Sequence, residues 1–152
     1  MKKLFAVILA VALVMSLSVT AFAANTTGGD ADITTSIEPT YTVTIPADVN
    51  VAFNATETAF GAIEVTASQI HPNKCIKVAL TTDGELNNAI DNTKVIPYAI
   101  KDSEGAAFTS ATYLTEGDKT ELSIHITADD WNAAYAGDYT DTVTFTVSYE
   151  DK

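Results

Sequence analysis

The chain has 152 residues, of which 47% are hydrophobic, and its 20 acidic residues, eight lysines and absent arginines give a formal net charge of −12 at pH 7. Such a negative charge argues against nucleic acid and anionic membrane surfaces as partners, because lysine and arginine supply the affinity for both. The single cysteine, Cys75, excludes a disulfide within the chain. In a secreted chain it is either a small buried residue or the site of a bridge between chains.

The first 23 residues have the pattern of a secretory signal peptide. Two lysines precede an apolar run from residue 4 to residue 15, and Ala21-Phe22-Ala23 supplies the small-x-small cleavage pattern. The stretch from Leu4 to Ala24 is nearly long enough for an uncleaved membrane anchor, but the Ala-Phe-Ala site favours cleavage. All 20 acidic residues and six of the lysines follow Ala23, so the remaining 129 residues have a net charge of −14. We therefore expect one secreted domain without membrane contact after cleavage.

Residues 24–38 form a small, polar leader. Ile33 and Ile37 make one alternating apolar pair in it, and Glu38-Pro39 ends it. The leader is either a flexible segment before the domain or a donor strand that adds to the sheet edge of a neighbouring molecule.

Residues 39–152 show the period-two alternation of β-strands, with turn signals between the segments. Strands are expected at residues 40–45, 48–53, 60–66, 75–82, 95–101, 111–114, 120–127 and 139–149. Pro97 makes the strand at 95–101 an edge or bulged strand. Residues 127–135 are expected to form one helical turn with Thr127 as its N-cap. The fold class is therefore all-β, an immunoglobulin-like antiparallel β-sandwich of about seven or eight strands.

The segment from Gly137 to Tyr149 has the strongest alternation in the chain. Its even positions from residue 140 to residue 148 carry hydroxyl side chains, and its odd positions are mainly apolar. The odd-position residues expected to face the core are Tyr139, Val143, Phe145, Val147 and Tyr149. Asp141 is the odd-position residue that does not fit a core, so we expect that end of the strand at a sheet margin.

The sequence contains no motif that indicates catalysis, and we expect a protein that is not an enzyme. His71, Cys75 and His125 do not have the spacing of a zinc site. The acidic clusters lack an EF-hand pattern and are more often a solvated face than a calcium site. No metal or other cofactor is expected.

Aromatic side chains suggest a second type of site. Four of them are able to stack on sugar rings: Trp131, Tyr135, Tyr113 and Tyr98. In the alternative interpretation, Trp131 and Tyr135, four residues apart on the helical turn, cover the open end of the sandwich.

The ending Ala136-Gly-Asp-Tyr-Thr-Asp-Thr-Val-Thr-Phe-Thr-Val147 resembles the last strand of the spore coat protein U and fimbrial-subunit group. Gly137 and Tyr149 lie twelve residues apart, as the corresponding glycine and tyrosine do in such pilins. The resemblance covers mainly residues 120–150 and implies a β-sandwich of surface fibres or coats. The chain lacks that group's usual disulfide, and Tyr149 is three residues from the end. The same strand also resembles, more weakly, the WxL-type cell-surface domain, although Trp131 is followed by Asn-Ala.

These patterns together predict a secreted, non-enzymatic structural or adhesive surface protein, a fibre or coat subunit that assembles with itself or with other surface proteins. The alternative is a monomeric extracellular module that binds a glycan or a cell-wall polymer. The arginine-free, acidic mature chain and its signal peptide fit a protein secreted by a Gram-positive bacterium.

Overall fold

A computed structural model describes residues 30–152; the predicted signal peptide and residues 24–29 of the leader lie outside the described residues. The chain divides into two compact units, and the boundary between them in the sequence lies between Thr35 and Ser36. Residues 30–35 of the first unit are exposed and carry no regular secondary structure. None of the helices in the described part is both long enough and apolar enough to span a membrane.

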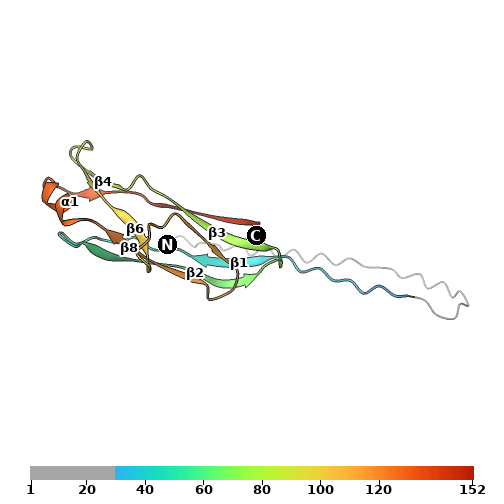
Figure 1. Ribbon diagram of the computed structural model, residues 1–152. Coiled ribbons are helices and arrows are strands. Elements are labelled where there is room, and N and C mark those ends of the chain that lie inside the picture. The colour runs from blue at the N-terminus through green and yellow to red at the C-terminus, as the bar shows by residue number, and fades with distance from the viewer. Residues whose placement is uncertain (1–29) are drawn as a thin grey trace, which may run out of the picture. The chain divides into compact units, whose positions relative to one another are not determined.

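The second unit contains ten strands and one short helix (Figure 1). The strands are β1 (Thr40–Thr44), β2 (Glu57–Gln69), β3 (Lys74–Thr81), β4 (Glu85–Asn88), β5 (Val95–Pro97), β6 (Ala99–Asp102), β7 (Ser110–Tyr113), β8 (Lys119–His125), β9 (Tyr139–Thr140) and β10 (Thr144–Asp151), and the helix is α1 (Ala128–Ala133). All strand pairs are antiparallel, so the predicted all-β sandwich is confirmed.

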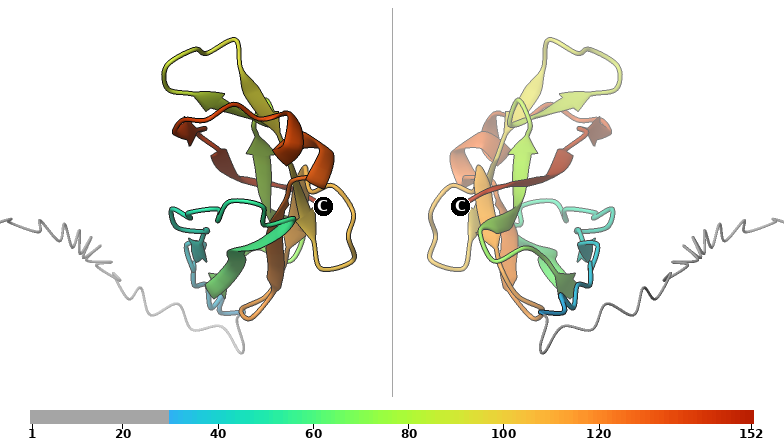
Figure 2. Two further views of the ribbon diagram at one scale, coloured as in Figure 1. Left: turned by 90° about the vertical axis from the view of Figure 1, so that its left-hand side faces the viewer. Right: turned by 90° about the vertical axis from the view of Figure 1, so that its right-hand side faces the viewer.

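The strands form a four-stranded sheet A, in the order β1-β2-β8-β6, and two three-stranded sheets, B (β10-β3-β7) and C (β5-β4-β9). Two chain segments, β3–β4 and β9–β10, each contribute one strand to sheet B and one strand to sheet C. The β3–β10 ladder ends at the pair Thr81 and Thr144, and the β4–β9 ladder resumes at the pair Asn87 and Thr140. Figure 2 shows the resulting arrangement from both ends.

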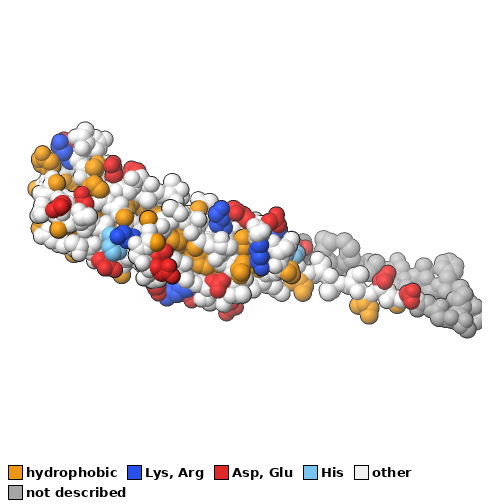
Figure 3. Space-filling model, viewed as in Figure 1, with side chains coloured by type: hydrophobic (Ala, Val, Ile, Leu, Met, Phe, Trp, Pro, Cys, Tyr) orange, Lys and Arg blue, Asp and Glu red, His pale blue; other side chains and the backbone are white. Residues whose placement is uncertain are grey.

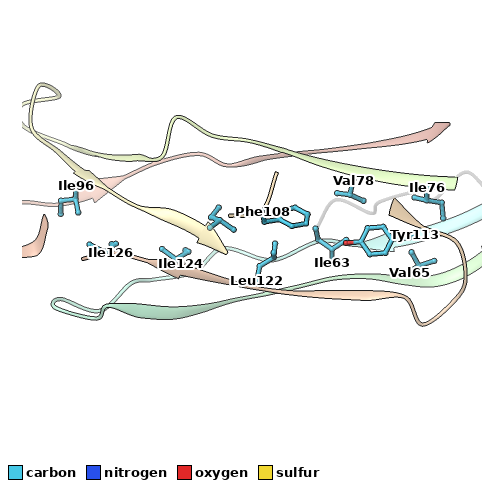
Figure 4. Close-up of a cluster of buried hydrophobic side chains, with 11 residues drawn as sticks. Ile63, Val65, Ile76, Val78, Ile96, Phe108, Tyr113, Leu122, Ile124 and Ile126 are labelled. Atoms are coloured by element: carbon cyan, nitrogen blue, oxygen red, sulfur yellow. The ribbon is translucent and has the colours of Figure 1, made fainter. Parts of the chain in front are cut away.

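The core lies between the layer of β2 and β8 and the layer of β3 (Figure 4). It is formed mainly by β-branched side chains at alternate strand positions, which suit a pleated, buried surface. The buried members are Ile63, Val65, Ile76, Val78, Ile96, Ile100, Phe108, Tyr113, Leu122, Ile124 and Ile126.

The closing segment is not the single core strand that its alternation predicts. It splits into β9, which pairs with β4, and β10, which pairs with β3. Tyr139, Val143 and Phe145 pack against the core but are only partly buried, and Val147 is 40% exposed. The physical reason is that β10 is an edge strand with a neighbour on one side only.

The segment 48–53 is also not a strand, contrary to its alternation: residues 45–56 carry no strand pairing. Pro46 has no N–H to continue a ladder. It packs against a bulge in β2, where Gly61 has a φ of +117° and a Cβ atom would lie 3.5 Å from the Pro46 Cβ. The chain therefore leaves the edge of sheet A after β1.

Other local signals are confirmed. Thr127 caps α1, with its side chain accepting a hydrogen bond from the Asp130 N–H. The proline-interrupted segment divides into β5 and β6, which are edge strands of two different sheets. The division of this segment and of the closing strand, together with the unpredicted β4, raises the strand count above eight.

One side of the sandwich is closed by the chain itself. Residues 106–109 cross from one sheet to the other: the Phe108 N–H donates to the Ile100 carbonyl of β6, and the Leu80 N–H of β3 donates to the Thr109 carbonyl, at 2.9 and 2.8 Å. This crossover satisfies backbone groups of both layers on the side of β6 and β7.

The position of the core leads to a first prediction. Ile63→Ala removes a side chain with no solvent exposure and is expected to lower the free energy of unfolding by about 2–5 kcal/mol. The matched change Val147→Ala, in the half-exposed face of β10, is expected to cost less than about 1 kcal/mol. Urea unfolding of both variants measures the difference, and equal losses would contradict the placement of the core.

Candidate assembly groove

An apolar groove lies between the segment that follows β1 and the segment that leads into β10. Its volume is about 410 Å³. Its apolar walls are formed by Ile45, Pro46, Ala47, Val49, Val51, Phe60, Leu86, Ile124, Val143 and Phe145. Ile124 belongs to the hydrophobic core, and the partly buried Phe60, Leu86, Val143 and Phe145 pack against it, so the groove leads from the surface to the core.

The groove continues toward α1. A second hollow, also of about 410 Å³, shares Val49, Val51 and Leu86 with the first and extends to Phe53 and Trp131. We call the whole feature the assembly groove and define it by residues 45–53 on one side and residues 139–145 on the other.

The strands on either side of this opening have free edges. β1 pairs only with β2, and β10 pairs only with β3. Within residues 30–152 no backbone hydrogen bond joins β1 to β10. One aromatic pair joins β1 to β10, since Tyr41 stacks on Tyr149 with ring centroids 5.7 Å apart, and a second joins β2 to β10, with Phe60 lying 6.0 Å from Phe145. The unpaired N–H and C=O groups of such edges are able to accept a further strand.

A polar cluster forms one wall of the groove. The hydroxyl groups of Tyr98 and Thr82 lie 2.7 Å apart, and both are within hydrogen-bond reach of the Asp141 carboxylate. Burial, followed by the hydrogen bond to Asp141, raises the pKa of Tyr98 from 10.0 to about 12, and the hydrogen bond with Thr82 opposes this rise. Asp141 stands at the break between β9 and β10, where sequence reasoning expected a sheet margin.

Gly137, the first residue of the predicted closing segment, has a packing role near α1. Its φ is +148°, and a Cβ atom would lie 2.6 Å from the Asn88 Nδ2 atom. Asn88 is buried, and its Oδ1 atom accepts hydrogen bonds from the N–H groups of Ile90 and Asp91. A side chain at position 137 would therefore displace the amide that holds the loop after β4.

Tyr149 lies at the other end of β10. Its hydroxyl accepts a hydrogen bond from the His71 N–H at 2.9 Å, and the Lys74 ammonium lies 5.9 Å from its ring centroid. Together with the Tyr41 stack, these contacts fix the end of β10 to the β2–β3 loop and to β1.

The predicted donor residues are exposed. Ile33 is 98% exposed and Ile37 is 62% exposed, and neither belongs to a strand. A donor role for residues 24–38 stays a prediction.

The four aromatic residues predicted as a glycan site do not come together. Tyr113 is 2% exposed and donates to the Thr120 hydroxyl, and Tyr98 lies in the assembly groove. Trp131 packs against the core, as expected for a residue that covers the end of the sandwich, but Tyr135 is 63% exposed. The prediction that these four aromatic residues form one glycan site is therefore wrong.

The sequence does not indicate Phe53 as a site residue, because the alternation at 48–53 predicts a strand there. Phe53 is 77% exposed and meets Trp131 edge-to-face, with ring centroids 5.6 Å apart. The available signal was its position before Asn54, a residue type that favours turns.

Cys75 is buried, with its Sγ atom 3.7 Å from the Glu150 carbonyl oxygen. Among residues 30–152 no three His, Cys, Asp or Glu side chains are grouped as a metal site requires.

No protein family and no curated protein matches the chain. Among solved structures, the chain is similar to a chain of a chaperone–tip adhesin complex of CFA/I fimbriae biogenesis, with 10% sequence identity and a TM-score of 0.47. The similarity covers 71% of this chain and 42% of the other, so this chain spans less than half of that protein's length. At this level the similarity supports no functional conclusion.

The polar cluster leads to a second prediction. Asp141→Asn removes the carboxylate that accepts from Tyr98, so the pKa of Tyr98 is expected to fall from about 12 but to stay above 10.0, because burial is the larger cause. Alkaline titration of the tyrosinate absorbance measures this change against the other five tyrosines. If the variant titrates like the unmodified protein, Asp141 does not contribute to the raised pKa of Tyr98.

The same shift has a consequence for stability. Between pH 10.0 and about 12 the unfolded chain has released the Tyr98 proton and the folded chain still holds it. The stability that protonated Tyr98 contributes is therefore complete below pH 10 and decreases as the pH rises through this window.

Proposed function

We propose that this chain is a secreted, non-enzymatic structural subunit of the cell surface, which assembles when an extended segment of a second copy enters the assembly groove. The observation that carries the proposal is the apolar groove between the segment that follows β1 and the segment that leads into β10, two strands that are each paired on one side only. The absence of catalytic motifs supports a non-enzymatic role, and the predicted signal peptide supports secretion. Secretion and cell-surface location, as expected for a Gram-positive protein, belong to this proposal.

The groove offers two interactions to an extended segment. Half-exposed apolar side chains, such as Val49 at 38% exposure and Ile45 at 45%, would be covered by the incoming side chains. Where the groove reaches the start of β10, at Thr144 and Phe145, the free edge of that strand would supply backbone hydrogen bonds. A strand bound in this way would also connect the two layers on the side that the chain leaves open.

The leader of a second copy is the proposed occupant. In an extended chain, Ile33 and Ile37 project from the same face, about 13 Å apart. Both side chains are exposed in the single molecule and would gain from burial. Pro39 follows the leader and separates it from β1.

Charge opposes this assembly. Asp30, Asp32 and Glu38 lie on the described part of the leader, and Asp48 and Asp141 line the groove. Salt screens such repulsion, since the Debye length falls to about 3 Å at 1 M ionic strength. Assembly should therefore strengthen as the salt concentration rises, the opposite of an association held by opposite charges.

The principal experiment compares residues 24–152 with residues 39–152. The longer form is expected to give oligomers or fibres that grow with protein and salt concentration, and the shorter form is expected to stay monomeric. Light scattering after size-exclusion chromatography and negative-stain microscopy measure both. Two monomeric forms at high protein and salt concentration would refute self-assembly.

A groove variant tests the acceptor side separately. Val49→Arg places a charged side chain in the groove at a half-exposed position, so the fold is expected to persist while assembly of residues 24–152 is lost. Leu114→Arg, at 41% exposure and outside the groove, is the matched control and should assemble normally. Normal assembly of the Val49 variant would show that the groove is not the acceptor.

A further inference from the structure

We propose a second binding site, for an uncharged carbohydrate, in a pocket at the α1 end of the domain. The pocket has a volume of about 560 Å³, within the usual range for small-ligand sites. It lies between the turn at residues 52–55 and the segment 131–139. Hydrophobic side chains are visible at this end of the molecule in Figure 3. We call it the tip pocket.

Aromatic rings dominate the tip pocket. Phe53 and Tyr135 are the most exposed of them, at 77% and 63%, while Trp131 and Tyr139 lie deeper and pack against the core. Large exposed rings are costly to leave in water and provide flat apolar surfaces for the C–H faces of a sugar ring. Asn54 and Asn132 also line the pocket, and each amide offers donors and an acceptor to sugar hydroxyl groups.

The protruding ring is held in a rigid turn. The Ala55 N–H donates to the Ala52 carbonyl at 3.0 Å, and Asn54 has a φ of +63°, which L-residues rarely adopt. The Trp131 indole N–H donates to the Ala55 carbonyl at 2.9 Å. The Trp131 side chain thus holds the turn that carries Phe53 in place. A ring held in this way loses little conformational freedom when a ligand binds.

Charge identifies the class of ligand. None of the residues that line the tip pocket is acidic or basic, although the sequence contains 20 acidic residues and eight lysines. The Lys94 ammonium is not part of the lining but lies 5.2 Å from the centroid of the Tyr135 ring. A pocket for a cation would use the abundant carboxylates, and an anion would be repelled by the negative protein. Aromatic faces with neutral amides instead suit a neutral sugar.

The tip pocket does not depend on assembly. The tip pocket and the α1 end of the assembly groove share five residues: Phe53, Ile96, Trp131, Gly137 and Tyr139. Val49 does not line the tip pocket, and Tyr135 and Asn132 do not line the groove. Variants at these positions therefore separate the two proposals.

The test uses the only tryptophan of the chain as the reporter. Residues 24–152 are titrated with neutral tetrasaccharides of glucose, galactose, mannose and N-acetylglucosamine, and with one sialylated oligosaccharide, while Trp131 fluorescence is recorded. At least one neutral sugar is expected to change the fluorescence with saturation in the millimolar range. Tyr135→Ala is expected to weaken that binding about tenfold, and Asn132→Ala is expected to weaken it less.

Two matched variants complete the design. Tyr41→Ala removes another partly exposed tyrosine outside the pocket, and Val49→Arg blocks only the assembly groove; both should bind the sugar normally. The proposal is overturned if none of the neutral sugars binds, if the sialylated sugar binds more tightly, or if Tyr41→Ala weakens binding as much as Tyr135→Ala. Loss of binding in Val49→Arg would assign the sugar to the assembly groove instead.

Discussion

Four side chains without solvent exposure, Ile63 and Val65 on β2 and Ile76 and Val78 on β3, join the two layers of the sandwich. Both strands lie in the interior of their sheets, so these fully buried side chains lie at the centre of the sandwich, while β1 and β10 are edge strands. This distribution decides where the molecule remains open. A sandwich centred on β10 would have buried the residues that instead border the groove.

The sequence predicted the fold class, most of the strands and the cap at Thr127, because these features depend on local alternation and on a single side-chain hydrogen bond. It predicted that the closing segment, Gly137 to Tyr149, is one core strand, whereas the segment forms two edge strands. Alternation shows that one face of a strand is shielded from water, but an edge strand meets that condition as well as a central one. The segment at 48–53 alternates for a related reason, since Val49 and Val51 face the groove without belonging to a sheet.

The candidate sites were less accessible to sequence reasoning. Asp141 was recognised as a misfit in an apolar strand, but its partners Tyr98 and Thr82 lie 43 and 59 residues away in the sequence. Phe53 meets Trp131 across a still larger separation in the sequence. Such sites arise where loops from different strands meet, and no short pattern records the meeting. The leader residues Ile33 and Ile37 were identified because an apolar pair stands out in a polar segment.

In the proposed assembly, the crossover at residues 106–109 limits the number of neighbours that one molecule accepts. It closes one side of the sandwich with hydrogen bonds to both layers, and the assembly groove lies on the other side, between residues 45–53 and 139–145. A subunit with one acceptor and one leader has a valence of two, with unlike ends. Contacts of this head-to-tail type produce a ring or an unbranched chain in which every molecule points the same way. A polymer of such subunits would have a growing end chemically different from its starting end, and it would lengthen without branching.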